Sequence, residues 1–194
     1  MALTLRWGTV TAVTQRVEGL VRCEVDGRAA VAYPRLTGDV QAGDTVVVNV
    51  QAADLGLGSG GFDVVYANLT RGLKLPAGEG AHVMTLPYPP GQSAARFVEE
   101  GETPMPWLDW MPVVCCTLHS QLAPVVAGIG PGHRIAYVQH AGGALPVSLS
   151  DTVRALKLRS LVEVAVGVAP CHDGDVQAMT VASALAWART RGFD

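Results

Sequence analysis

The hydrophobic pattern changes character along the chain, and this change limits the folds that the sequence can adopt. Over residues 1 to about 70, short segments that are mostly rich in β-branched residues follow one another with no clear helical period. Turn dipeptides separate them at Asp26-Gly27, Gly38-Asp39 and Gly43-Asp44. The predicted strands cover residues 4–14, 19–25, 28–33 and 45–50. Short strands joined by tight turns predict a small barrel or a curled sheet.

From residue 113 onward, continuous apolar segments alternate with segments of helical character. Strands are predicted at 113–118, 134–139 and 161–168, and helices at 119–129, 145–158 and 176–189. This alternation predicts a parallel sheet with right-handed crossovers and both faces covered. The expected fold class is therefore α/β plus all-β: a barrel-like domain at 1–80, followed by a partial Rossmann-like domain at 113–194.

Between these domains, residues 81–112 are predicted to form a proline-rich linker with one short helix at 92–100. Trp107 and Trp110 are expected to pack this linker onto a domain, with a sugar or base platform as the alternative. A glycine-rich segment at 53–68 lacks both the Gly-Lys-Ser/Thr of a P-loop and the strand-to-helix context of a dinucleotide site. A tight structural turn is therefore favoured there over a phosphate loop.

Charge and composition exclude several classes of protein. The formal net charge of the 194 residues is −3 and the basic residues are scattered, so no nucleic-acid surface is expected. No apolar run is long enough to span a membrane, and residues 1–8 do not resemble a secretory signal. Four cysteines without C-x-x-C spacing predict reduced, mostly buried thiols in a cytoplasmic protein.

Only 16% of the residues are charged, against about 25% in an ordinary soluble domain. We therefore expect part of the surface to face another domain or subunit, which makes a homo-oligomer one interpretation. The predicted parallel sheet has only three strands, and the sequence stops after a helix where a fourth strand is expected. This predicts that the chain is the N-terminal part of a longer protein.

Five sequence blocks resemble an uncharacterised bacterial family, the domain of unknown function 3866. In chain order they are LGLGSGG at 55–61, AHVMTLPYPP at 81–90, LHSQLAP at 118–124, YVQHAGGALPVSLSDTV at 137–153 and GDVQAMTVASAL at 174–185. The resemblance implies a cytoplasmic bacterial protein and implies no activity. The chain departs from the family pattern at three places. His140-Ala141 stands where an Asp usually precedes Gly-Gly, Pro170–Asp173 replaces a glycine-rich segment, and Gln177 replaces Glu.

Polar residues follow each of the three predicted parallel strands, where ligands of open α/β sheets bind. Because carboxyl ends of parallel strands share one edge of a sheet, we expect these residues to converge. The candidate ligand-binding residues are His119, Ser120, Gln139, His140, Gly142, Gly143, His172, Asp173 and Asp175.

Each of these candidates also has a structural explanation. Gly142-Gly143 precedes a predicted helix, whose N-terminus favours an anion. The alternative is that the two glycines form a plain β-α turn. Asp173 or Asp175 is expected first as a helix cap, and second as a metal ligand together with His119 and His172. Cys171 beside His172 is the best thiol candidate, while Ser120 lies outside any G-x-S-x-G elbow.

Two function classes remain. In the first, the α/β domain binds, and in an enzyme also acts on, a small anionic metabolite or nucleotide at the strand ends. In the second, the chain is a non-catalytic interaction or assembly protein. Reaction type, cofactor and metal are left open by the sequence.

Overall fold

The computed structural model describes residues 3–57, 60–71, 80–81, 83–86, 88–101, 107–140, 145–170 and 173–194. Gly142, Gly143, Cys171 and His172 lie outside these residues. The chain divides into two units, Met1–Pro76 and Ala77–Asp194.

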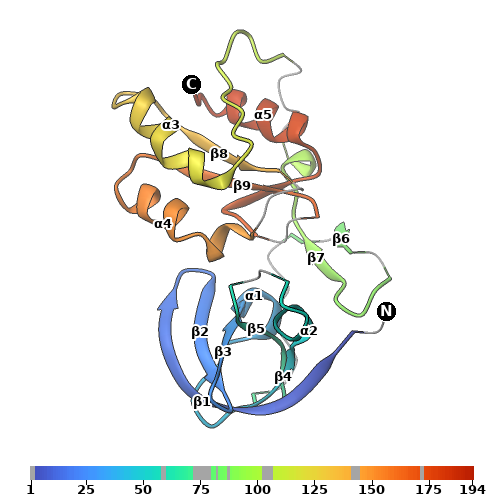
Figure 1. Ribbon diagram of the computed structural model, residues 1–194. Helices are drawn as coiled ribbons and strands as arrows, with labels where there is room; N and C mark the ends of the chain where they lie inside the picture. Colours follow the sequence, from blue (N-terminus) through green and yellow to red (C-terminus); the bar gives the residue numbers. More distant parts are fainter. Residues whose placement is uncertain are drawn as a thin grey trace. The chain divides into compact units, whose positions relative to one another are not determined.

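The first unit is a closed five-stranded β-barrel (Figure 1). Its strands are β1 (Leu5–Val17), β2 (Leu20–Val25), β3 (Arg28–Ala32), β4 (Thr45–Asn49) and β5 (Asp63–Asn68). The spatial order is β1-β2-β3-β5-β4, closed by antiparallel pairing of β1 with β4, and only β3 and β5 run parallel. The predicted barrel is confirmed.

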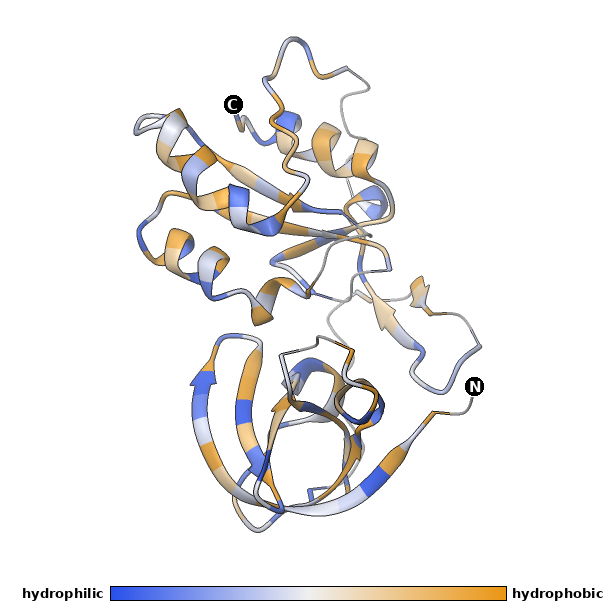
Figure 2. Cartoon of the chain, in the orientation of Figure 1, coloured by the Kyte–Doolittle hydropathy of each residue, from blue (hydrophilic) through white to orange (hydrophobic). Residues whose placement is uncertain are grey.

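Buried valines line the interior of the barrel. Inward residues such as Val10, Val25, Val46 and Val48 are almost fully buried, and hydropathy alternates along β1 and β2 (Figure 2). Asp26 and Gly27 both have positive φ, of 50° and 76°, as a two-residue hairpin turn between antiparallel strands requires. Two short helices, α1 (Pro34–Thr37) and α2 (Gln51–Asp54), connect the strands.

Two buried carboxylates fix the ends of the barrel. Asp63 accepts hydrogen bonds from Arg28, at 3.1 Å, and from Arg6, at 3.5 Å. Asp44 accepts from Arg71, Asn68 and the backbone of Gln41. Burial opposes ionisation of Asp44, but these hydrogen bonds outweigh it and hold its pKa below the ordinary value.

The second unit contains a three-stranded parallel sheet in the order β10-β9-β8. The strands are β8 (Ala136–Gln139), β9 (Val164–Val168) and β10 (Val176–Ala178). Helices α3 (Leu122–Ile129) and α4 (Asp151–Leu158) pack on one face, against Tyr137 and Ala165. Helix α5 (Val181–Thr190) packs on the other, against Val138, Val166 and Ala178 (Figure 1). The parallel sheet with both faces covered is therefore confirmed.

The remaining elements of this unit are short. They are the hairpin β6 (Val83–Thr85) and β7 (Ser93–Ala95), and the 3-10 helices η1 (Val98–Glu100), η2 (His119–Gln121) and η3 (Val147–Leu149). Phe97 forms a single parallel bridge to Gln177, which places the start of η1 beside β10. In the part of the chain that the structure describes, no helix is long and apolar enough to cross a membrane.

Several predicted elements are wrong. Residues 113–118 form no strand: they are exposed, and no backbone–backbone hydrogen bond joins residues 112–117 to another described segment. An apolar run predicts burial, but a strand also needs a neighbour for its N–H and C=O groups. The segment predicted as a helix at 92–100 is β7 followed by η1. Within η1, the Glu100 side chain accepts from the backbone N–H of Phe97, and the Glu99 side chain accepts from the backbone N–H of Met179. The predicted helix at 176–189 begins with strand β10.

Two predictions of burial are also wrong. Trp107 and Trp110 are 74% and 98% exposed, so they do not pack the linker onto a domain. Cys115 and Cys116 are exposed free thiols because their segment joins no sheet, whereas Cys23 is buried in the barrel. In the glycine-rich loop, the described residues Gly56, Gly60 and Gly61 all have positive φ, which favours glycine in a structural turn.

Candidate functional site

His119 lies at the start of η2 and connects three elements of the second unit. Its Nε2 is 2.7 Å from the hydroxyl of Ser150, which precedes α4. Its Nδ1 is 3.3 Å from the hydroxyl of Tyr137 on β8. Tyr137 in turn donates a hydrogen bond to the side chain of Gln139 at the end of the same strand. We call these four residues the strand-end network.

The hydrogen-bond directions in this network determine the tautomer of His119. Because the Tyr137 hydroxyl donates to Gln139, it can only accept from Nδ1 of His119. The neutral ring then carries its proton on Nδ1, and Nε2 accepts from the Ser150 hydroxyl. Burial lowers the pKa of His119 below its ordinary value, which favours this neutral form.

The network leaves little capacity for a ligand. Ser150 is 3% exposed and Gln139 is 5% exposed, and the Ser150 oxygen also accepts from the backbone N–H of Val153 as the N-cap of α4. The side chains therefore satisfy one another. This arrangement orders η2, β8 and α4 relative to one another, which is a positioning role.

The structure brings some of the predicted site residues together and separates others. His119 and Gln139 meet through Tyr137, although His119 follows no strand, because the strand predicted at 113–118 does not form. Ser120 and His140 are exposed, unlike the buried Ser150 and Gln139 of the network. Gly142, Gly143 and His172 fall outside the described residues, so the prediction of an anion at Gly142-Gly143 stays a prediction.

Asp173 and Asp175 have structural partners of their own. The Asp173 carboxylate accepts from the backbone N–H groups of Ser148, at 2.6 Å, and Gly174, at 2.9 Å. Asp175 accepts from the backbone N–H of Ala165, at 2.7 Å, and pairs with Lys157.

The prediction that either aspartate caps the third helix is wrong. Helix α5 begins only after strand β10, and its N-cap is Thr180, whose hydroxyl accepts from Ser183 at 3.0 Å. Among the described residues, no group of three or more His, Cys, Asp and Glu side chains is placed to hold a metal ion.

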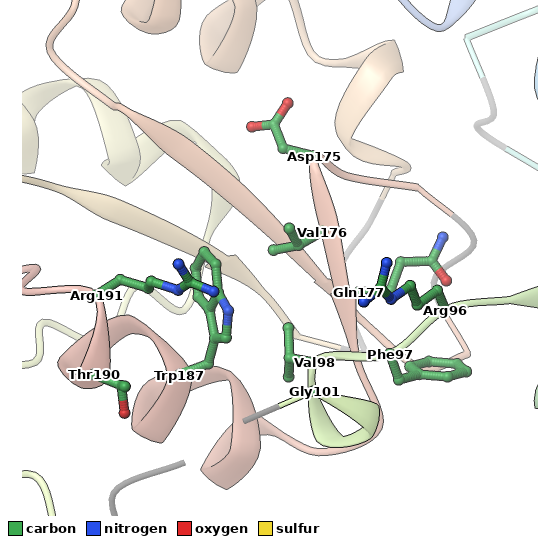
Figure 3. A pocket seen from close by; sticks show the side chains of 10 residues that line it. All are labelled: Arg96, Phe97, Val98, Gly101, Asp175, Val176, Gln177, Trp187, Thr190 and Arg191. Carbon is green, nitrogen blue, oxygen red and sulfur yellow. The ribbon is translucent and has the colours of Figure 1, made fainter. Parts of the chain in front are cut away.

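A pocket that sequence reasoning missed lies between η1, β10 and α5. Its volume is about 320 Å³ (Figure 3). Arg96 comes from the residue pair between β7 and η1, Gln177 from β10, and Trp187 and Arg191 from the end of α5. We call it the Arg96–Arg191 pocket.

The charge of this pocket is positive. Arg96 and Arg191 form no ion pair with any carboxylate of the described chain, whereas Arg134, Arg154 and Arg189 each do. Asp175 also borders the pocket, but its carboxylate points away from Trp187 and Val98 in Figure 3 and is neutralised by Lys157.

Aromatic contacts hold Arg191 at one side of the pocket. Its guanidinium lies 5.9 Å from the centroid of the Trp187 ring. Trp187 stacks on Phe193 at 6.0 Å, and the Arg134 guanidinium lies over the Phe193 ring at 4.6 Å. Such cation–π contacts orient a guanidinium without neutralising its charge. No local sequence signal marks this pocket, because its arginines come from distant segments that meet only in the fold.

The fold and the pocket together define a two-unit protein: a closed β-barrel, and a parallel α/β unit that carries a basic pocket. The chain belongs to the family described as Protein of unknown function (DUF3866), whose model matches residues 29–192. This match confirms the family predicted from the five sequence blocks. No curated protein matches the chain, and no solved structure matches it.

Proposed function

We propose that this protein binds a small anionic molecule, and that the Arg96–Arg191 pocket holds it. The observation that carries the proposal is the pair of guanidinium groups that border one cavity without a carboxylate partner among the described residues. Hydrogen bonds from a charged donor to an anion are roughly twice as strong as neutral ones. The strand-end network supports the same choice indirectly, since its side chains are already satisfied by one another.

The proposal is binding rather than catalysis. Among the described residues, no His, Cys or Lys borders the pocket, and the hydroxyl of Thr190 donates to the backbone carbonyl of Ala186. With Asp175 paired to Lys157, no residue there is arranged as a general base or a nucleophile.

We also propose that the second unit is Rossmann-like. Two consecutive parallel strands, β8 and β9, with α4 between them support a Rossmann-like unit. The prediction that Gly142-Gly143 forms a second anion-binding element at the carboxyl end of β8 fits this classification.

The test is isothermal titration of the full chain with inorganic phosphate and with butyrate at low salt. Replacing both arginines in the double variant Arg96→Ala/Arg191→Ala should weaken binding by roughly tenfold or more, since it removes both charged donors. Arg159→Ala is the matched control: this exposed arginine ends α4 and does not border the pocket. Equal binding by all variants, or no binding of either anion, would contradict the proposal.

A second candidate function is self-association through the barrel. The outward residues of β4, of β5 and of the Leu5–Thr9 part of β1 form an uncharged face, with Leu5 opposite Asn49, and Trp7 opposite Val47. Trp7 is 69% exposed, and a second cavity of about 300 Å³ is bordered by Asn49 of β4 and by Leu55, Leu57 and Phe62. An uncharged face does not repel its own copy, and large exposed apolar patches mark interaction sites.

Light scattering coupled to gel filtration tests this second candidate. We expect a dimer that Trp7→Ser or Leu57→Ser converts to a monomer, while Leu158→Ser leaves it unchanged. Leu158 is 82% exposed at the end of α4 and serves as the control. A monomeric wild-type protein at the concentrations of the titration would contradict self-association.

A further inference from the structure

The two arginines of the Arg96–Arg191 pocket lie at different ends of it. Figure 3 shows the Arg96 guanidinium beside Gln177, and the Arg191 guanidinium against the Trp187 ring. Val98 and Val176 stand between the two ends. The positive charge of the pocket is therefore divided between two positions instead of being gathered at one.

The middle of the pocket is apolar. Val98 and Val176 are only partly buried, and both pack against the cluster of Val166, Ala178 and Ala184 that joins α5 to the sheet. Their exposed surface faces a cavity and not a packed neighbour. An apolar wall of this kind favours contact with methylene groups over contact with a charged or strongly hydrated group.

The aromatic ring of Trp187 offers little room for a nucleotide base. Phe193 stacks on it with an interplanar angle of 28°, and the Arg191 guanidinium lies near its centroid. A base that stacks on Trp187 would compete with these contacts. The chemistry of the pocket therefore favours an aliphatic ligand over a nucleotide.

We infer that the ligand of this pocket is an aliphatic dianion, with one anionic group for each arginine and methylene groups across Val98 and Val176. A linear dicarboxylate is the simplest molecule of this class. The inference rests on the proposed function, namely that the pocket binds anions. Two valine side chains separate the guanidinium groups, so a ligand with a single carboxylate meets one arginine and leaves the other uncontacted. Once one carboxylate is bound, the second meets its arginine as an intramolecular event.

The experiment compares dicarboxylates with monocarboxylates of the same chain length on the full-length chain. Succinate, glutarate, adipate and pimelate are titrated by calorimetry at constant ionic strength, beside butyrate, pentanoate, hexanoate and heptanoate. We expect one dicarboxylate to bind at least about tenfold more tightly than its matched monocarboxylate. We also expect a maximum of affinity at one chain length, because only one length spans the two arginines.

Single substitutions separate the two ends. In Arg96→Ala and in Arg191→Ala, the affinity of the best dicarboxylate should fall to that of its monocarboxylate, while Arg159→Ala should retain the full difference. Circular dichroism of each variant checks that the fold is kept. A residual preference for dicarboxylates in both pocket variants would overturn the inference.

The outcomes distinguish this inference from the proposed function. If monocarboxylates and phosphate bind through Arg96 and Arg191 but no dicarboxylate binds more tightly, the dianion inference is wrong and anion binding stands. If no anion binds, or if binding survives in the double variant Arg96→Ala/Arg191→Ala, both are wrong.

Discussion

The Nε2 atom of His119 lies 2.7 Å from the Ser150 hydroxyl, and this contact joins two segments that the sequence separates widely. Ser150 is also the N-cap of α4, because its oxygen accepts from Val153 at 3.0 Å. One side chain therefore begins a helix and holds a histidine in a defined tautomer. A serine hydroxyl beside a histidine nitrogen resembles a nucleophile–base pair. Ser150 is only 3% exposed, however, so we assign the pair a structural role.

Ser150→Ala should destabilise the protein by about 1–2 kcal/mol. The substitution removes the cap of α4 and leaves Nε2 of His119 without its donor. Urea denaturation followed by circular dichroism measures the change. Ser120→Ala is the matched control, since Ser120 is exposed in η2, and it should leave the midpoint unchanged. A stable Ser150→Ala protein would show that the contact contributes little.

His119 should make stability fall at mildly acidic pH. Burial holds its pKa in the folded state below the unfolded value of about 6.5. The unfolded chain then binds the proton more readily, so the stabilising contribution is complete above about pH 6.5 and is lost as pH falls toward the folded pKa. Wild type and His119→Gln are compared by urea titration from pH 8 to pH 5. The stability difference between them should shrink below about pH 6.5, and a difference independent of pH would contradict the assignment.

The barrel could be predicted from the sequence because its signals are local. β-Branched residues dominate β4, and Asp26-Gly27 supplies the positive φ values of a hairpin turn. The closure of β1 onto β4 and the parallel pairing of β3 with β5 could not be predicted, because long-range pairing leaves no local pattern.

In the second unit, the apolar runs that form β8 and β9 were predicted, whereas the equally apolar run at Val113–Leu118 joins no sheet. Composition alone cannot tell a paired segment from an unpaired one.

The contacts of the candidate site are likewise not encoded in local composition. The contact of His119 with β8 does not arise from a shared strand end, because the segment before His119 joins no sheet, and the meeting of Arg96 with α5 depends on how η1 packs against β10.

The described cysteines should differ sharply in reactivity. Burial raises the pKa of the Cys23 thiol to about 11, although the charge of Arg16 lowers it somewhat. Cys115 and Cys116 are exposed. Because the thiolate is the nucleophile, iodoacetamide at pH 8 should label Cys115 and Cys116 and leave Cys23 unmodified. Peptide mass spectrometry reads out the sites, and labelling in guanidinium chloride shows that Cys23 reacts once unfolded. Early labelling of Cys23 in the native protein would contradict the closed barrel.

Gly167→Ala should be the most damaging of these changes, because the chain after β9 folds back over this residue. A Cβ atom at Gly167 would lie 1.7 Å from the backbone oxygen of Asp173, and no side-chain rotation can relieve a clash with backbone. The Asp173 backbone would have to move, and with it the carboxylate that holds Ser148. We expect a loss of about 3 kcal/mol or more, or failure to fold. Gly128→Ala in α3 is the control: nothing lies within 4 Å of its added Cβ, so it should be neutral or stabilise by up to about 1 kcal/mol. Thermal unfolding of both variants measures the contrast, and equal midpoints would show that the segment over Gly167 packs less closely than this.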